Sequence, residues 1–345
     1  MKTTYSVLGV MAGSSMDGLD IALVSFRKGK NWSFQIKNHK TIPYENQLYL
    51  RLKESPDTSY EHQRALDIDF GKWTGIKINK FIEGRAVDLI SVHGHTLVHS
   101  PKNKISRQLG DGKTIAEVTN IQTVTSFRSE DIQKGGQGAP LVPLGDFELF
   151  LDFEACLNLG GIANISIRDE KSAWDICPCN QILNYYASKL GKAYDNEGQL
   201  AEKGKLDHEF VNKILKMPYF HLSPPKSLPN AFIKHSFLDL IDPRDGLRSY
   251  SEFIANQISA DLKPYRNGKL LVTGGGGFNN FLVSRIQKSL PDWKVVIPHT
   301  SIIAYKEALI FAFLGLKRIL GEVNVLRSVT GAVSDSSSGT IHHPE

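Results

Sequence analysis

The strongest constraint on this fold is a hairpin plan that occurs twice, once near the start of the chain and once near its middle. In each copy, two apolar stretches flank a short turn of Gly, Ser, Asp or Asn, which is typical of two antiparallel strands. The stretches are residues 5–10 and 21–26 in the first copy, and 155–159 and 162–167 in the second. This repetition indicates a weak internal duplication, with two halves that open in the same way.

Length and alternation then define the class of fold. A chain of 345 residues exceeds what one hydrophobic core usually serves, so we predict two domains. Strand patterns alternate with helical spacing in both halves, and this predicts an α/β protein. We place an N-terminal domain at residues 1–150 and a C-terminal domain at 151–345. The return of the last residues to the first domain is left open.

A Gly-rich segment at residues 124–143 follows a short β-branched run and is predicted to line a pocket. Its polar residues Ser129, Glu130 and Asp131 form an exposed turn in this interpretation. Three glycines follow, Gly135, Gly136 and Gly138, which let the backbone approach a ligand closely. An irregular surface loop is the alternative.

Three Gly-rich turns at strand ends favour a bound nucleotide. Successive backbone N–H groups in such turns form concavities that hold phosphate. The turns occupy residues 11–20, 160–161 and 274–277. Asp17 and Asp20 add carboxylates beside the first turn, as a hydrated Mg²⁺ would need. The Gly274 run lacks the last glycine of the dinucleotide-binding fingerprint, and the chain has no Walker A loop, so neither of those sites is predicted.

Composition argues against several other classes of partner. The net charge of +5 is mild and no dense Lys/Arg block occurs, so we expect no nucleic acid. No apolar segment approaches the ~20 residues of a membrane span, and we expect no membrane partner. Three sparse cysteines indicate a reduced, cytoplasmic location. A zinc hydrolase that uses His93 and His95 is a rival hypothesis, but such a site needs more ligands, and of the other nine histidines only His99 lies near in the sequence.

Six motifs in order resemble those of the anhydro-N-acetylmuramic acid kinase family. They are Met-Ala-Gly-Ser-Ser-Met-Asp-Gly-Leu-Asp (11–20), Gly-Gly-Gln-Gly-Ala-Pro-Leu-Val-Pro (135–143), Asn-Leu-Gly-Gly-Ile-Ala-Asn (158–164), Pro-Pro-Lys-Ser (224–227), Gly-Gly-Gly-Gly (274–277) and Ser-Val-Thr-Gly-Ala (328–332). The resemblance implies a two-domain actin/hexokinase-like (ribonuclease H-like) fold with ATP and Mg²⁺ in an interdomain cleft. It also implies a small anhydro sugar as substrate. Water opens the 1,6-anhydro bridge and O6 is phosphorylated, in peptidoglycan recycling. The oligomeric state stays open, with a homodimer as one alternative.

The resemblance also assigns residues by position. The nucleotide-binding set is Gly13, Ser14, Ser15, Met16, Asp17, Gly18, Leu19, Asp20, Gly160, Gly161, Asn164, Gly274, Gly275, Gly276 and Gly277. The set that lines the sugar pocket is His93, Gly94, His95, Gly135, Gly136, Gln137 and Gly138. Asp17 would lie near Mg²⁺ and contact it through water.

Departures from the family pattern fall around the sugar. The family has Asp-Phe-Arg where this chain has Ser126, Phe127 and Arg128, and the missing aspartate resembles a general base. A hydroxyl has no basicity near neutral pH, and loss of a positioned base typically costs ~10²–10⁴ in rate. Asp131 is a candidate substitute for the base. A nucleotide- and sugar-binding homologue with impaired catalysis is therefore the alternative function. Glu307 matches a family acid whose role we leave unassigned.

Overall fold

The computed structural model describes residues 2–13, 16, 18–224, 226–228, 232–265 and 267–345. The chain divides into two compact units. Unit 1 comprises Met1–Phe150 and Tyr305–Glu345, and unit 2 comprises Leu151–Ala304. The last 41 residues of the chain thus belong with the first half.

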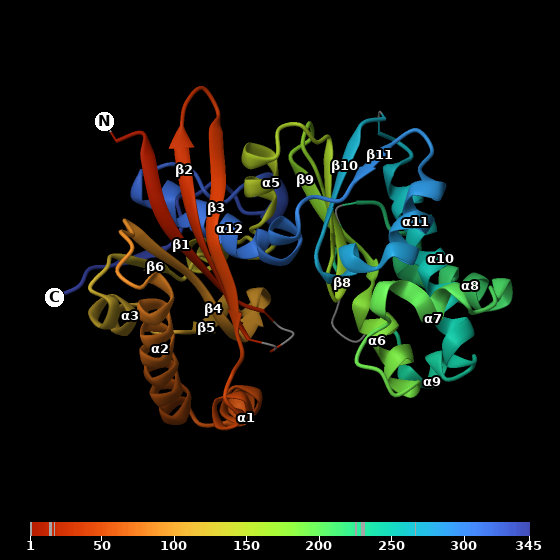
Figure 1. Cartoon of the computed structure of the whole chain (residues 1–345), viewed down its shortest axis with the longest axis horizontal. Coiled ribbons are helices and arrows are strands. Elements are labelled where there is room, and N and C mark those ends of the chain that lie inside the picture. The colour runs from red at the N-terminus through yellow and green to blue at the C-terminus, as the bar shows by residue number, and fades with distance from the viewer. Residues whose placement is uncertain (1, 14–15, 17, 225, 229–231, 266) are drawn as a thin grey trace. The chain divides into compact units, whose positions relative to one another are not determined.

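Unit 1 is built on a seven-stranded sheet. Three long antiparallel strands come first: β1 (Thr4–Ala12), β2 (Leu19–Lys28) and β3 (Trp32–Ile42). The strands β4 (Leu89–Ser100) and β6 (Thr123–Thr125) then continue the sheet in parallel from β1. The short strand β12 (Thr340–His342) pairs antiparallel with β6, and β5 (Ile105–Leu109) pairs with β4. Figure 1 shows β1, β2 and β3 side by side.

Helices cover this sheet and fill the connections. They are α1 (Asn46–Glu54), α2 (Tyr60–Ile82), α3 (Gly112–Thr119), α4 (Ser129–Gln133), α5 (Pro143–Leu149), α12 (Thr300–Ile319) and α13 (Arg327–Thr330), of which α12 belongs to unit 1 from Tyr305 onwards. The long α2 begins at the N-cap Ser59, which accepts a hydrogen bond from the His62 amide. It buries Leu66, Phe70 and Ile78 in a cluster with apolar residues of β1, β2 and β4. Such burial is the main source of stability for an amphipathic helix.

Unit 2 repeats the plan on a five-stranded sheet. Its strands are β7 (Ala155–Leu159), β8 (Ile162–Ile167), β9 (Ser172–Pro178), β10 (Lys269–Thr273) and β11 (Lys294–Val296). Its helices are α6 (Asn180–Lys189), α7 (Gln199–Glu202), α8 (His208–Leu215), α9 (His235–Leu238), α10 (Pro243–Leu262) and α11 (Asn280–Ser289). Single-turn 3₁₀ helices in the chain are η1 (Ser55–Asp57), η2 (Pro101–Asn103), η3 (Asn196–Gly198), η4 (Pro218–His221) and η5 (Gly275–Phe278). A large apolar cluster fills the unit, with Tyr250 and Phe253 of α10 fully buried.

The two sheets share one connectivity. The order is β3-β2-β1-β4-β6 in unit 1 and β9-β8-β7-β10-β11 in unit 2. In both, an antiparallel meander is followed by two strands parallel to the first strand of the meander. This is the connectivity of the ribonuclease H-like fold, twice in one chain. The predicted α/β class, the duplicated hairpin and the actin/hexokinase-like architecture are confirmed.

One local prediction is wrong, for a tertiary reason. The polar turn at 129–131 is the helix α4, and Asp131 is fully buried because it bonds to the loop that follows. The strand β4 continues to Ser100, so His93 and His95 lie within it. In the polar loop at 334–339, Ser338 is buried and donates to the carbonyl of Phe127 at 2.7 Å. None of the helices in the described residues is long and apolar enough to cross a membrane.

Candidate active site

The turn between β1 and β2 holds the predicted first phosphate loop. Its described residues are Gly13, Met16, Gly18, Leu19 and Asp20, and Ser14, Ser15 and Asp17 lie outside the described residues. The amide of Met16 donates to the carbonyl of Gly13 at 3.2 Å, which tightens the turn. Asp20 Oδ1 accepts a hydrogen bond from Thr41 Oγ1 at 2.6 Å on the neighbouring strand. A carboxylate of the kind that suits Mg²⁺ is thus fixed at this turn.

The Gly-rich loop after α4 is held by Asp131. Its Oδ2 accepts a hydrogen bond from the amide of Gly138 at 2.7 Å, and its Oδ1 accepts one from Thr330 Oγ1 at 2.6 Å. A Cβ atom on Gly136 would collide with the same carboxylate, so only glycine fits there. Gly135 and Gln137 are exposed at the tip of the loop. Asp131 therefore shapes the loop and, buried and bonded on both oxygens, is not placed to take a proton from water.

Partly exposed Arg128 and buried His93 form a hydrogen-bonded pair next to this loop. Arg128 donates through Nε and Nη2 to His93 Nε2 at 3.1 and 2.9 Å, and through Nη1 to the carbonyl of Gly138 at 2.8 Å. His93 Nε2 is therefore the acceptor, and its Nδ1–H donates to the carbonyl of Gly94 at 2.9 Å. Burial and the guanidinium hold the pKa of His93 well below its usual value, so the ring is neutral.

Arg128 keeps its positive charge although it is partly buried. Burial lowers the pKa of Arg128 to about 10, and Glu307 opposes the shift. The guanidinium is therefore protonated at neutral pH. Glu307 on α12 is partly exposed and makes no hydrogen bond or ion pair within the described part of the chain. Burial raises the pKa of Glu307, while Lys306 and Arg128 lower it. A carboxyl group with a raised pKa and no partner is typical of a functional site.

His95 lies two residues along β4 and is also buried. Its Nδ1 atom has no hydrogen-bond partner among the described residues. Burial lowers the pKa of His95, so the neutral ring offers one donor and one acceptor. A buried polar atom without a partner is rare in native proteins and fits a position that a ligand completes.

The zinc hypothesis finds no support in this geometry. Both ring nitrogens of His93 are already used, one by Arg128 and the other by Gly94. No group of three metal-ligating side chains occurs among the residues that the structure describes. All three cysteines are buried, and burial raises the pKa of Cys177 and Cys179.

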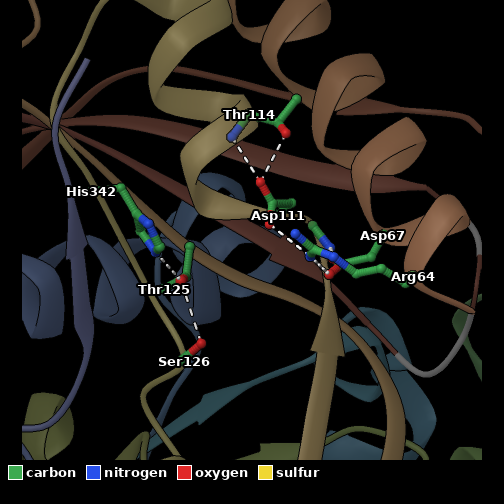
Figure 2. A network of polar contacts seen from close by, with 8 residues as sticks. Arg64, Asp67, Asp111, Thr114, Thr125, Ser126 and His342 are labelled. Carbon is green, nitrogen blue, oxygen red and sulfur yellow. Dashed lines mark hydrogen bonds and ion pairs between the residues drawn. The ribbon is translucent and has the colours of Figure 1, made fainter. Parts of the chain in front are cut away.

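Ser126 directly follows β6, at the position where the resemblance expects a base. Its φ of 59° lies in the left-handed region, which a non-glycine residue adopts only when the surroundings impose it. Its Oγ lies 3.4 Å from Thr125 Oγ1, which in turn lies 2.9 Å from His342 Nε2 (Figure 2). The side chain of Ser126 is partly exposed.

Unit 2 brings two predicted Gly turns to one edge of its sheet. β7 and β10 are parallel and end together, with Asn158 opposite Thr273, so the turns that follow are neighbours. Gly274 has a φ of 80°, and a Cβ there would lie 2.8 Å from the carbonyl carbon of Leu159. Asn180 at the start of α6 donates to the carbonyl of Leu159 at 2.9 Å and braces the same edge.

The turn at 160–161 has amides to offer a ligand. The carbonyls of Gly160 and Gly161 accept from the first amides of α6, from Asn180 at 3.1 Å and Cys179 at 2.8 Å. The amides of both glycines donate no backbone hydrogen bond within the described residues. Asn164 pairs with Asn158 across the hairpin. Open amides beside a Gly turn suit a phosphate group.

Sequence reasoning missed a third turn at this edge, Asp195 to Gly198. Asp195 accepts hydrogen bonds from the amides of Leu200 and Ala201 at 2.8 and 2.9 Å. Gly198 packs so closely on Asn279, the N-cap of α11, that no Cβ would fit. The Asp-x-x-Gly spacing is the sequence signal that could have identified this turn.

The family model for anhydro-N-acetylmuramic acid kinase matches residues 5–344, nearly the whole chain. This chain belongs to the anhydro-N-acetylmuramic acid kinase family. Members are sugar kinases, which are phosphotransferases that use ATP. The resemblance, the enzyme class and the use of ATP predicted from the sequence are confirmed.

Full-length relatives carry the same family name. The anhydro-N-acetylmuramic acid kinase of Sulfurimonas denitrificans is 31% identical, with 97% of this chain and 98% of that protein covered. That of Mannheimia succiniciproducens is 33% identical, with 99% of each chain covered. Among solved structures, a ROK family glucokinase from Streptomyces griseus, in complex with glucose and AMPPNP, aligns with a TM-score of 0.44. Its identity is 13%, and 89% of this chain and 97% of that chain are covered.

Proposed function

We propose that this protein phosphorylates 1,6-anhydro-N-acetylmuramic acid or a closely related anhydro sugar. Water opens the anhydro bridge at the anomeric carbon, and O6 accepts the γ-phosphoryl group of ATP. The observation that carries the proposal is the family match over residues 5–344, which includes every phosphate-binding turn predicted from the sequence. The product would enter peptidoglycan recycling, and we propose that the protein acts in the cytoplasm.

We assign the nucleotide to the Gly turns of unit 2 and the turn between β1 and β2. The open amides of Gly160 and Gly161 suit the phosphates, and the close backbone at Gly274 suits the adenosine side. Asp20 and Asp17 would hold Mg²⁺, with Asp17 acting through water. Bound Mg²⁺ would neutralise charge on the phosphates. The carboxylate of Asp20, held by Thr41, fits such an ion.

We assign the sugar to the Arg128–His93 pair and the Gly-rich loop of unit 1. Arg128 supplies a fixed positive charge, and the open Nδ1 of His95 supplies a polar contact. His93, Gly94 and the loop residues Gly135, Gly136, Gln137 and Gly138 complete this set. A substrate with an anionic group, such as the lactyl carboxylate of a muramic sugar, can pair with the guanidinium of Arg128.

The alternative is a homologue that binds both ligands without turnover, and Ser126 motivates it. A coupled ADP-release assay with Mg·ATP and the anhydro sugar separates the two. We expect sugar-dependent ADP release, and a faster rate for Ser126→Asp because a carboxylate can hold the proton of the attacking water. If neither the wild type nor Ser126→Asp releases ADP in a sugar-dependent way, the proposed function is wrong. Size-exclusion chromatography decides between monomer and homodimer.

A further inference from the structure

A chain of hydroxyl groups leads from the expected base position to a histidine of the C-terminal strand. Ser126 Oγ lies 3.4 Å from Thr125 Oγ1, and Thr125 Oγ1 lies 2.9 Å from His342 Nε2. Either hydroxyl can donate in the first contact. Neighbouring residues of a strand normally point to opposite faces of the sheet. The left-handed φ of Ser126 breaks this alternation, and its hydroxyl comes within reach of Thr125.

The surroundings of His342 favour a ring that is neutral at rest and can take up a proton. Burial lowers the pKa of His342, while the carboxylate of Asp111 opposes that shift. Asp111 caps α3 through Thr114 and pairs with Arg64 of α2 at 2.8 Å (Figure 2). The neighbouring His343 opposes protonation slightly, and Gly112 packs directly against the imidazole.

We propose that Ser126, Thr125 and His342 form a proton relay that replaces the missing carboxylate base. This inference rests on the proposed function. Ser126 meets the attacking water, whereas Thr125 and His342 act through it and are positioning residues. The relay explains how a chain with serine at this site keeps the proton-transfer step that a lone hydroxyl cannot perform.

The relay balances its protons and electrons. As water attacks the anomeric carbon, one of its O–H bonds breaks and the proton passes to Ser126 Oγ. Ser126 passes its own proton to Thr125 Oγ1, which passes its own to the lone pair of His342 Nε2. The bond from the anomeric carbon to O6 breaks, its electron pair stays on O6, and O6 takes the phosphoryl group from ATP. The imidazolium then releases a proton to solvent, because His342 is partly exposed.

The test measures kcat/KM against pH for the wild type, His342→Gln and the double variant Ser126→Asp/His342→Gln. Glutamine retains an acceptor for Thr125 but has no basicity, so a purely structural role of His342 would survive the change. We expect a loss of about 10²-fold in kcat/KM at pH 7, at the low end of what a general base contributes. In His342→Gln, the fall of kcat/KM on the acid side of the pH profile (the acid limb) should disappear, and Tm should stay near that of the wild type. In the Ser126→Asp background, His342→Gln should change kcat/KM less than about threefold, because the carboxylate bypasses the relay.

His343→Gln is the matched control. His343 is the adjacent, exposed histidine and contacts Gln122, so the change alters the same strand without touching the relay. Thr125→Ser should retain activity, whereas Thr125→Val should lose as much as His342→Gln.

A wild-type rate and pH profile in His342→Gln would overturn the relay alone. So would an inactive wild type that Ser126→Asp activates. If the wild type and Ser126→Asp are both inactive, the proposed function itself is wrong. If Glu307→Gln alone removes the acid limb, the proton goes to Glu307 and the relay is wrong.

Discussion

Thr330 donates its hydroxyl to Oδ1 of Asp131 at 2.6 Å and so joins two residues that lie 199 positions apart in the chain. Both residues are buried. The hydrogen bond ties the C-terminal segment to the helix that precedes the Gly-rich loop, and the other oxygen of Asp131 holds that loop.

Loss of this bond is expected to destabilise unit 1. Thr330→Val removes the hydroxyl at constant shape and leaves a buried carboxylate oxygen without its donor, which should cost about 1–3 kcal/mol of unfolding free energy. Urea unfolding followed by tryptophan fluorescence measures the loss. Thr4→Val, an exposed change at the start of β1, is the control and should cost less than about 0.5 kcal/mol. Equal urea midpoints for Thr330→Val and Thr4→Val would contradict the structural role of Asp131.

Two adjacent glycines of the loop should differ sharply when each is replaced by alanine. A Cβ on Gly136 collides with the carboxylate of Asp131, whereas a Cβ on Gly135 meets nothing within 4 Å. Gly135 has a φ of 79°, so Gly135→Ala should cost about 1 kcal/mol from the backbone alone. Gly136→Ala should cost more than that and should reduce kcat/KM for the sugar at least tenfold, while the KM for ATP stays constant. Steady-state kinetics and thermal unfolding of both variants measure these losses. Similar losses in both variants would mean that Asp131 does not shape the sugar loop.

The nucleotide assignment makes a matched prediction in unit 2. Gly274→Ala places a Cβ 2.5 Å from Asn158 Oδ1 and pushes the two Gly turns apart. Gly191→Ala is the control, because its φ of 71° resembles the 80° of Gly274 but nothing lies within 4 Å of its Cβ. We expect the affinity for Mg·ATP in calorimetry to fall at least tenfold in Gly274→Ala and to change little in Gly191→Ala. Unchanged affinity in Gly274→Ala would move the adenosine site elsewhere.

Buried histidines of β4 should make the protein less stable in acid. The pKa of His93 is lowered in the folded state, so below an ordinary value of about 6.5 the unfolded chain binds a proton that the folded chain does not. Stability is therefore full above that pH and falls as the pH drops through this window, by up to about 1.4 kcal/mol per pH unit for one group. His93→Gln keeps an acceptor for Arg128 and should flatten the fall of Tm between pH 7 and 5. The exposed control His62→Gln should leave the slope as in the wild type, and a steep slope in His93→Gln would refute the assignment.

The sequence predicted the elements whose signals are local. The hairpin at 155–167 occupies the predicted strands β7 and β8, because Gly turns and apolar spacing act over a few residues. Family motifs pointed to the loops that unit 2 gathers at one sheet edge.

The burial of Asp131 could not be predicted in this way. A Ser-Glu-Asp run is polar and reads as exposed, and only a partner 199 residues away, Thr330, makes its burial favourable. The same holds for His342, whose neighbour Thr125 comes from a strand 217 residues earlier. Long-range pairing of this kind leaves no periodic pattern in a single sequence. The strand β12 was missed for that reason, since three residues carry too little pattern to identify a strand.

The pairing of β12 with β6 has a consequence for synthesis. His342 of β12 lies beside the base position that follows β6, although 217 residues separate it from its neighbour Thr125. During translation, Ser126 therefore emerges long before the strand that borders it. Catalytic competence would thus arise only once residues 340–342 have been synthesised and have joined the edge of the sheet.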